Sequence, residues 1–490
     1  MTGRRFVVIG AGVVGAAVAE ELTARGETDV TVLDKGPLYA TGGSSTPEAL
    51  VDGAPSIDAS PADLSRFADI ELSPAVFGAR CDDSYRDVYA VHHPAEGHTS
   101  ARDLRLAPFA TRQRELGAAW FDGAGGWERP RWYEANAPLV EGLPLPERDA
   151  WASRHWSPLV AGEHLAVRER GGLFDMTPLT RIEVVGADAE AFLLKMCAGL
   201  VDRPSGSVTY TVMLDAAGGI RSDVTVARIG PDRYLLGANG PRDVAWLRAH
   251  APDDVSVDDV TAGTCCLAVW GPVARDALAP LVGPDLDDVT FPYMSVRRLH
   301  VGEVPVTAVR ISYAGELGWE LTASADLGAH LWDTVWAAGA PLGLIAAGTG
   351  ALAGMRIEKG YRAWGTDLTP EHTPDGAGLR FTVRPDPTFI GAEALSARAV
   401  AGSERRLRFL ELADDQVAMG GEPVLANDAP VGYVTSAAYG FSVGRSLAYA
   451  WLDPSVEVGD PLSIGYFDRW LAATVAPGPA FDPQGLRVRG

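Results

Sequence analysis

The chain has 490 residues, 47% of them hydrophobic and 22% charged, which is enough for roughly two to four domains with a large core. Its formal net charge of −22 repels phosphate backbones and acidic membrane surfaces, which argues against nucleic-acid or lipid binding. No apolar run reaches the roughly eighteen residues needed to span a membrane. The four cysteines form no C-x-x-C pair, so we expect a reducing, cytoplasmic location and no structural metal site.

The first fifty residues begin with a dinucleotide-binding pattern. Apolar strands are expected at residues 6–9 and 30–33, with a helical pattern between them. The first strand leads into G-x-G-x-x-G, and an acid that could bind ribose hydroxyls follows the second. The helix start would direct backbone amides towards a pyrophosphate. The candidate nucleotide residues are Gly10, Gly12, Gly15 and Asp34.

The stretch YTVMLDAAGGIRSDVTV, residues 210–226, predicts a β-hairpin that turns at Gly218-Gly219. Asp223 would then begin a buried return strand, where a carboxylate is costly unless it meets a partner. The plainer alternative is a turn carboxylate bonded to the glycine amides. Asp215 lies on the other side of the turn. If the two acids lie close together, one should have a raised pKa and could shuttle a proton.

A second stretch, MRIEKGYRAWGTDL, covers residues 355–368. Its first part is typical of a helix end, with Lys359-Gly360 as the stop. Arg362 and Trp364 follow on a segment that we expect to be extended. Arginine suits a carboxylate, such as an acidic tail on a ligand, and tryptophan suits stacking on a flat ring.

Together with ISYAGELGWEL, residues 311–321, these stretches resemble the aminomethyltransferase family, typified by the T protein of the glycine cleavage system. The resemblance extends from about residue 156 to the C-terminus. It implies an α+β fold of three parts arranged as a clover leaf, with a C-terminal β-barrel. It also implies transfer of one-carbon units with tetrahydrofolate or methylenetetrahydrofolate as cofactor.

The same resemblance assigns roles to residues of the three stretches. Asp223 would lie beside the folate amines and be the catalytic residue. Glu316 would accept the pterin 2-amino group and N3–H as a bidentate pair, although its glycine-rich loop could also be a simple hairpin. The expected folate-binding residues are Tyr210, Glu316, Arg356, Arg362 and Trp364.

Residues 1–50 and 85–140 resemble the start and the tail of the flavin domain of dimethylglycine and sarcosine dehydrogenases. The middle of that domain is missing, and a two-strand remnant cannot enclose an isoalloxazine ring. In many relatives a histidine for covalent flavin attachment follows the first block, whereas here none occurs before His92. Bound FAD is therefore doubtful. The first fifty residues are either a structural relic that folds against its neighbour or a site that still binds a nucleotide. Within the tail, we expect one helix over residues 100–120.

We therefore expect four segments. They are a truncated Rossmann-like α/β remnant (1–50), a linker with the flavin-domain tail (51–155), a folate-binding domain (156–400) and a β-barrel (401–490). The expected function is tetrahydrofolate-dependent one-carbon transfer or demethylation of a small amine or other methylated metabolite. The alternatives are a flavin-dependent dimethylglycine- or sarcosine-type dehydrogenase and a non-catalytic folate-binding subunit. Expected partners are a small one-carbon donor or acceptor, with a second copy or a separate flavoprotein left open.

Overall fold

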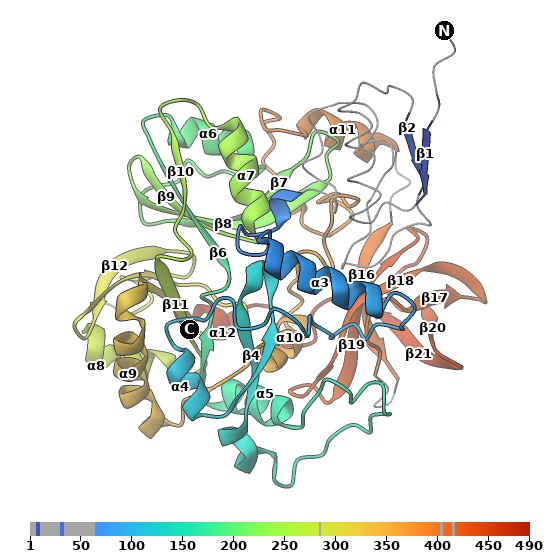
Figure 1. The fold of residues 1–490 in the computed structure, drawn as a ribbon, viewed down its shortest axis with the longest axis horizontal. Helices are drawn as coiled ribbons and strands as arrows, with labels where there is room; N and C mark the ends of the chain where they lie inside the picture. The colour runs from blue at the N-terminus through green and yellow to red at the C-terminus, as the bar shows by residue number, and fades with distance from the viewer. Residues whose placement is uncertain (1–5, 10–29, 34–63, 284–285, 402–404, 414–416) are drawn as a thin grey trace.

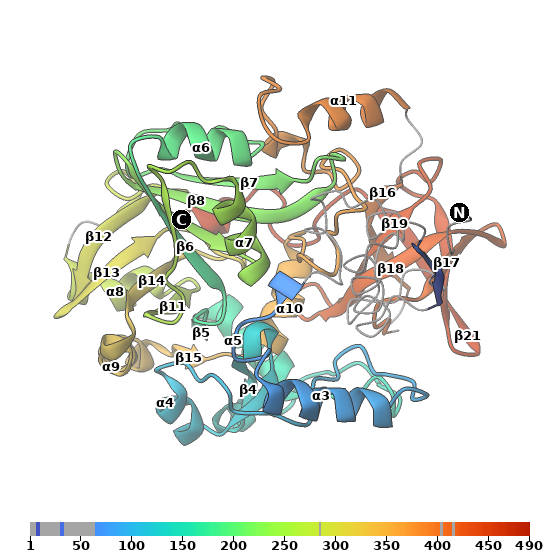
Figure 2. The same ribbon diagram turned by 45° about the horizontal axis from the view of Figure 1, so that its top comes forward.

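The computed structural model describes residues 6–9, 30–33, 64–283, 286–401, 405–413 and 417–490. Two lobes of mixed helix and sheet and one barrel surround the central helix α10 (Thr349–Glu358), as Figures 1 and 2 show. The α+β class and the three-part architecture expected from the sequence are therefore confirmed. Among the helices of the described ranges, none is long and apolar enough to cross a membrane.

Two short strands are described before residue 64. β1 (Phe6–Ile9) and β2 (Val30–Leu33) pair in parallel, at the positions predicted from the sequence. The four candidate nucleotide residues lie outside the described residues, so the nucleotide site stays a prediction. Those residues are Gly10, Gly12, Gly15 and Asp34.

The segment 100–120 is not one helix, contrary to the prediction. Helix α4 covers only Ala110–Glu115, because Pro108 disfavours helix before it and Gly117, with φ +70°, ends it in the left-handed region. The chain then enters the hairpin of β3 (Ala118–Asp122) and β4 (Glu128–Tyr133). The other elements of this region are α3 (Pro74–Arg86), α5 (Leu159–Glu169) and the 3-10 helices Leu64–Arg66, Ala124–Gly126 and Glu134–Val140.

The first lobe is an antiparallel five-stranded sheet in the order β10-β6-β9-β8-β7. Its hydrophobic core lies between the sheet and two helices, with Ile182, Val224 and Leu236 at most 1% exposed. The predicted hairpin is confirmed as β7–β8, and Gly218 has φ +80° at its turn. The elements are β6 (Thr180–Val185), α6 (Ala189–Met196), β7 (Val208–Leu214), β8 (Ile220–Gly230), β9 (Arg233–Ala238), α7 (Pro241–His250) and β10 (Ser256–Asp259).

The second lobe is a six-stranded sheet in the order β12-β13-β14-β11-β5-β15. Trp319 is fully buried in the core of this lobe, where it packs edge-on against Phe291. The elements are β5 (Gly172–Asp175), β11 (Thr264–Trp270), α8 (Ala274–Val282), β12 (Val296–Val301), β13 (Val304–Val309), β14 (Gly318–Ser324), α9 (Gly328–Gly339) and β15 (Ile345–Ala346), with short 3-10 helices at Ala325–Leu327 and Ala340–Leu342.

The C-terminal part closes into the predicted β-barrel, in the order β16-β19-β18-β17-β20-β21. Alternating buried positions along the strands fill its interior. The elements are β16 (Arg406–Leu412), β17 (Pro423–Ala426), β18 (Ala429–Gly440), β19 (Arg445–Leu452), β20 (Pro461–Tyr466) and β21 (Arg469–Ala476), flanked by the 3-10 helix Arg380–Thr382, α11 (Ala392–Ala401) and α12 (Leu486–Arg489).

One hydrophobic cluster joins the three parts. It takes Val212 from β7, Ile357 from α10 and Trp451 from β19, each of them at most 2% exposed. Burial of this kind contributes about 1.5–3 kcal/mol for each large apolar side chain. The cluster therefore holds the hairpin that carries Asp223 firmly against α10 and the barrel.

Candidate functional site

Asp223 lies on β8 opposite Val212 of β7, which places its side chain diagonally across from Tyr210 on the same face. The Tyr210 hydroxyl donates to Asp223 Oδ2 at 2.9 Å, and Asn239 Nδ2 donates to Oδ1 at 3.0 Å. A buried carboxylate needs hydrogen-bond partners, and Asp223 finds them in the phenol of Tyr210 and the side-chain amide of Asn239. Asn239 follows β9 and had no signal in the sequence.

The environment of Asp223 favours its protonated form. Burial raises the pKa of the carboxyl above its usual 3.8, while the hydrogen bonds from Tyr210 and Asn239 act in the opposite direction. Burial, reinforced by the nearby charge of Asp223, also raises the pKa of the Tyr210 phenol well above its usual value. The phenol therefore stays protonated and acts as a donor, while the carboxyl can hold or release a proton.

Asp215, and not Asp223, is the turn carboxylate that bonds to a glycine amide. Its Oδ1 accepts the Gly219 amide at 2.8 Å, so it closes the turn of the hairpin. Burial raises the pKa of Asp215, and the amides of the turn oppose this. Asp223 is bound by Tyr210 and Asn239 instead, so the two aspartates share no hydrogen-bond partner. The two acids are therefore not an interacting pair.

Tyr313 belongs to the site although sequence reasoning passed over it. Its hydroxyl donates to the Arg362 carbonyl at 2.7 Å, and its ring stacks on Tyr361 at 6.1 Å and 13°. Burial raises the pKa of Tyr313, and the charge of Asp223 adds to that effect. Tyr313 belongs to the same ISYAGELGWEL stretch as Glu316. Its place in that stretch was the only sequence feature that could have pointed to a role in the site.

Arg356 is engaged within the protein. Its guanidinium forms a buried ion pair with Asp367 and donates to the Tyr361 carbonyl at 3.1 Å. Asp367 also accepts the hydroxyls of Thr435 and Ser436, each at 2.6 Å. Arg356 therefore holds the segment after α10 against the barrel, and that segment carries the other two predicted residues.

Arg362 and Trp364 lie on this segment, as expected from the sequence. Arg362 Nη1 donates to the Gly360 carbonyl at 3.0 Å, and its buried Nε has no hydrogen-bond partner among the described residues. Arg362 also lowers the pKa of Tyr210 against the larger effect of burial, so the two side chains lie within electrostatic range. The guanidinium of Arg242 lies 5.3 Å from the centre of the Trp364 ring.

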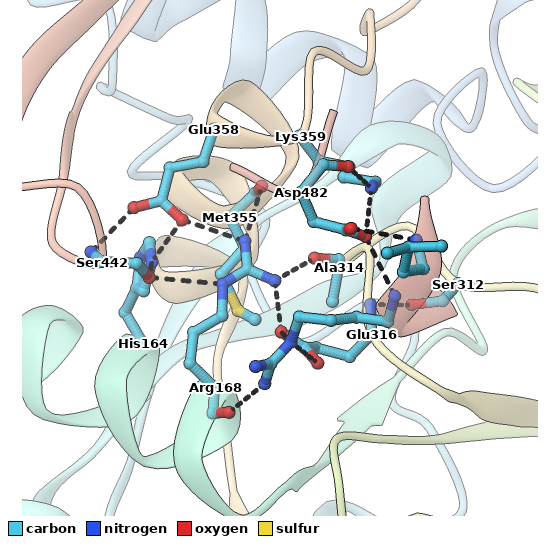
Figure 3. Close-up of polar contacts among 12 residues, drawn as sticks. His164, Arg168, Ser312, Ala314, Glu316, Met355, Glu358, Lys359, Ser442 and Asp482 are labelled. Atoms are coloured by element: carbon cyan, nitrogen blue, oxygen red, sulfur yellow. Dashed lines mark hydrogen bonds and ion pairs between the residues drawn. The ribbon is translucent and has the colours of Figure 1, made fainter. Parts of the chain in front are cut away.

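Glu316 lies in a buried ionic network, which Figure 3 shows. Its carboxylate is 1% exposed and accepts Arg168 Nη1 at 2.9 Å and Arg487 Nε at 2.8 Å. Burial raises the pKa of Glu316, and the charges of the two arginines oppose this shift. Both carboxylate oxygens are therefore engaged by arginines, one from α5 and the other from α12.

Arg168 is the centre of the network. Besides Glu316, it donates to Glu358 Oε2 at 3.0 Å and to the carbonyls of Ala314 and Met355 (Figure 3). Glu358 is fully buried and also lies 3.1 Å from His164 Nε2. The network therefore ties α5 and α10 to the loop before β14.

We expect Glu358 to make the protein sensitive to acid. Burial would raise the pKa of Glu358, but His164 and Arg168 lower it to about 2. Because its usual pKa is 4.5, its ionisation stabilises the fold above pH 4.5, and this contribution is lost as the pH falls towards about 2. Glu358→Gln should therefore lower the melting temperature at neutral pH and approach wild type in acid. A difference that stays constant with pH would contradict this assignment.

Comparison with known proteins accounts for most of the chain. Residues 109–386 match the model of the GCVT N-terminal domain, and residues 405–482 match the glycine cleavage T-protein C-terminal barrel domain. A third match, to the FAD dependent oxidoreductase central domain, covers residues 52–107.

Two curated relatives and one solved structure are similar. The chain is 33% identical to the 4-methylaminobutanoate oxidase (formaldehyde-forming) of Paenarthrobacter nicotinovorans, over 93% of this chain but only 56% of the oxidase. It is 34% identical to the aminomethyltransferase of Geobacillus thermodenitrificans, over 65% of this chain and 89% of that protein. The crystal structure of aminomethyltransferase T from Bartonella henselae shares the fold, with a TM-score of 0.67 at 23% identity over 78% of this chain and 99% of that one. Because the domain match covers more than half of its residues, the chain belongs to the aminomethyltransferase family of the glycine cleavage T protein.

Proposed function

We propose that this protein is a tetrahydrofolate-dependent one-carbon transferase that moves a methyl or methylene group to or from a small methylated amine at Asp223. The single observation that carries the proposal is the carboxyl of Asp223, which has a raised pKa and is held between Tyr210 and Asn239. Transfer of carbon between amines requires a proton to be held and released beside the reacting nitrogen. A carboxyl with a raised pKa performs that task nearer neutral pH than an ordinary aspartate does.

The residues around Asp223 fit a flat ligand with an acidic tail. Tyr313 and Trp364 supply aromatic rings, each packed against one neighbour (Tyr361 and Arg242), and the buried Nε of Arg362 lacks a partner among the described residues. Tetrahydrofolate would supply the nitrogens that carry the one-carbon unit. In this proposal Asp223 takes up and returns the proton at its carboxyl, and the Tyr210 hydroxyl stabilises the ionised form.

Glu316 is our proposed acceptor for the pterin edge, with one condition. Its carboxylate already accepts Arg168 and Arg487, so a bidentate ligand must displace one of them. Arg487 is the one that can leave, because its side chain is 40% exposed whereas that of Arg168 is 4% exposed. Helix α12, which carries Arg487, has only four residues.

This condition gives a direct test by calorimetric titration with tetrahydrofolate. We expect wild type to bind, and Arg487→Ala to bind a few-fold to about tenfold more tightly, because the competitor for Glu316 is gone. Arg489→Ala, an exposed neighbour on the same short helix, is the matched control and should leave the affinity unchanged. Weaker binding by Arg487→Ala would show that Arg487 holds folate instead of competing with it. Absence of binding to wild type would contradict the proposed function.

We also propose that this chain does not oxidise amines by itself. Its similarity to the FAD dependent oxidoreductase central domain covers residues 52–107 only. A one-carbon donor would then arrive already methylated or already activated, with a second copy or a separate flavoprotein as candidate partners. The four-segment division at residues 50, 155 and 400 belongs to the same proposal. Visible absorption by flavin in the purified protein would favour a dehydrogenase instead.

A further inference from the structure

Asp243 is a buried acid of the first lobe to which the proposed reaction gives no role. It stands in the first turn of α7 and is 2% exposed. Its Oδ2 accepts the Ser222 hydroxyl and the backbone amide of Asn239, each at 2.8 Å. Burial raises the pKa of Asp243, and these two hydrogen bonds and the charges of Arg242 and Arg221 oppose that shift. Asp243 is therefore a fixed hydrogen-bond acceptor, and the start of α7 favours its negative charge.

The Ser222 hydroxyl connects Asp243 to Asn239. A hydroxyl carries one hydrogen, and this one is donated to Asp243 Oδ2 at 2.8 Å, whereas the Asp223 carbonyl is a more distant acceptor at 3.5 Å. With its hydrogen directed at Asp243, Ser222 Oγ accepts Asn239 Nδ2 at 2.9 Å. Because Ser222 is fully buried, water does not compete for either bond. The chain of hydrogen bonds therefore runs from Asn239 through Ser222 to Asp243.

This chain of hydrogen bonds determines which end of the Asn239 amide faces Asp223. The same Nδ2 donates to the backbone carbonyl of Asp223 at 2.7 Å and to its Oδ1 at 3.0 Å. If the amide were turned over, its oxygen would replace Nδ2 beside these two acceptors and beside Ser222 Oγ. Ser222 could stabilise that orientation only by donating its hydrogen to the amide oxygen, and Asp243 already accepts that hydrogen. Asp243 therefore excludes the turned amide and keeps a donor directed at the Asp223 carboxyl.

We propose that Asp243 is a positioning residue for Asp223. Through the Ser222 hydroxyl it holds the Asn239 amide as a donor, and that donor favours the ionised form of the carboxyl. The Tyr210 hydroxyl supplies the other donor. This inference rests on the proposed function for its effect on turnover, but not for its effect on the ionisation of Asp223. The purely structural alternative is that Asp243 only secures the start of α7 by accepting the Asn239 backbone amide.

Ser222→Ala tests the proposal, because it breaks the chain of hydrogen bonds and leaves the charge of Asp243 in place. The ionisation of Asp223 should be followed by NMR of isotope-labelled aspartate carboxyls, with Asp223→Asn to identify the signal. We expect the titration midpoint of Asp223 to move to higher pH, since the ionised form loses a fixed donor. In turnover assays the acid limb of the kcat profile should move the same way. On that limb kcat should fall about tenfold, with KM little changed.

Ser256→Ala is the matched control, because Ser256 also donates to an aspartate, Asp258, but both lie exposed on β10. It should leave the midpoint and the kcat profile of the protein unchanged. Melting curves of all variants check folding.

Two further variants separate positioning from a structural role. Asp243→Asn should also move the midpoint to higher pH, because its amide can donate to Ser222 and free the hydroxyl hydrogen for the Asn239 oxygen. The lost charge acts in the opposite direction but has a smaller effect on Asp223 than the Asn239 hydrogen bond has. In a protein that already carries Asn239→Ala, Ser222→Ala should add no further change, since its effect passes through Asn239.

Three outcomes are decisive. A midpoint that is unchanged or lower in Ser222→Ala would overturn the proposal. An equal effect of Ser222→Ala with and without Asn239→Ala would also overturn it, and would leave Asp243 with the structural role alone. A midpoint that rises in Ser222→Ala, in a protein that turns over no folate substrate, would support the inference and refute the proposed function alone.

Discussion

Asp223→Asn is expected to lower kcat by about 100-fold or more while leaving the affinity for tetrahydrofolate close to that of wild type. The amide keeps the shape of the side chain and can still bond to Tyr210 and Asn239, but it cannot hold and release a proton. The rate should be measured as formation of the one-carbon folate product under saturating substrate. The pH profile of wild type should show an acid limb above the usual pKa of 3.8, because burial raises the pKa of Asp223, and the variant should lack it.

Asp215→Asn is the matched control, since Asp215 lies in the same hairpin and is also a half-buried acid. An asparagine oxygen can still accept the Gly219 amide, so the turn should persist and kcat should change by a small factor only. Equal losses in the two variants would mean that the hairpin, and not proton transfer at Asp223, limits the rate. Full activity of Asp223→Asn would exclude the catalytic role altogether.

Local patterns predicted much of the structure. The hairpin follows from alternating apolar residues and the glycine pair at its turn, and the pairing of Val212 with Asp223 confirms where the acid was placed. The stop of α10 follows from Gly360, which has φ +77°. The family was recognised from three short stretches, and the match over residues 109–386 confirms it. The expected helix over residues 100–120 was wrong, because one proline and one glycine outweighed its helix-forming residues.

The partners of the predicted site residues could not be predicted, because they come from distant parts of the chain. Glu316 meets Arg168 from α5 and Arg487 from the C-terminal helix, and nothing in the local sequence pairs them. A charged motif can suggest a ligand-binding role, but it does not reveal whether the protein itself already supplies the counter-ion.

Arg168→Leu should cause the largest loss of stability, about 3–5 kcal/mol, because it leaves two buried carboxylates without their shared counter-ion. Glu358 and Glu316 are at most 1% exposed, so water cannot replace the guanidinium. The carbonyls of Ala314 and Met355 would lose their donor as well. Chemical denaturation followed by tryptophan fluorescence should show a clearly lower midpoint. The denaturation midpoint of Arg168→Lys should lie between those of wild type and Arg168→Leu, since one ammonium cannot span both carboxylates and both carbonyls.

Arg445→Leu provides the comparison that makes this result specific. Arg445 pairs with Glu411 at 2.8 Å, but its side chain is 52% exposed, so its removal should change stability by at most about 1 kcal/mol. Similar midpoints for Arg168→Leu and Arg445→Leu would mean that water reaches the network around Glu316. In that case Arg487 would not be needed to screen Glu316, and a pterin could displace Arg487 with little loss of stability. A large, specific loss would instead mean that Arg168 must stay in place, so that Arg487 is the only arginine of the network that a ligand can replace.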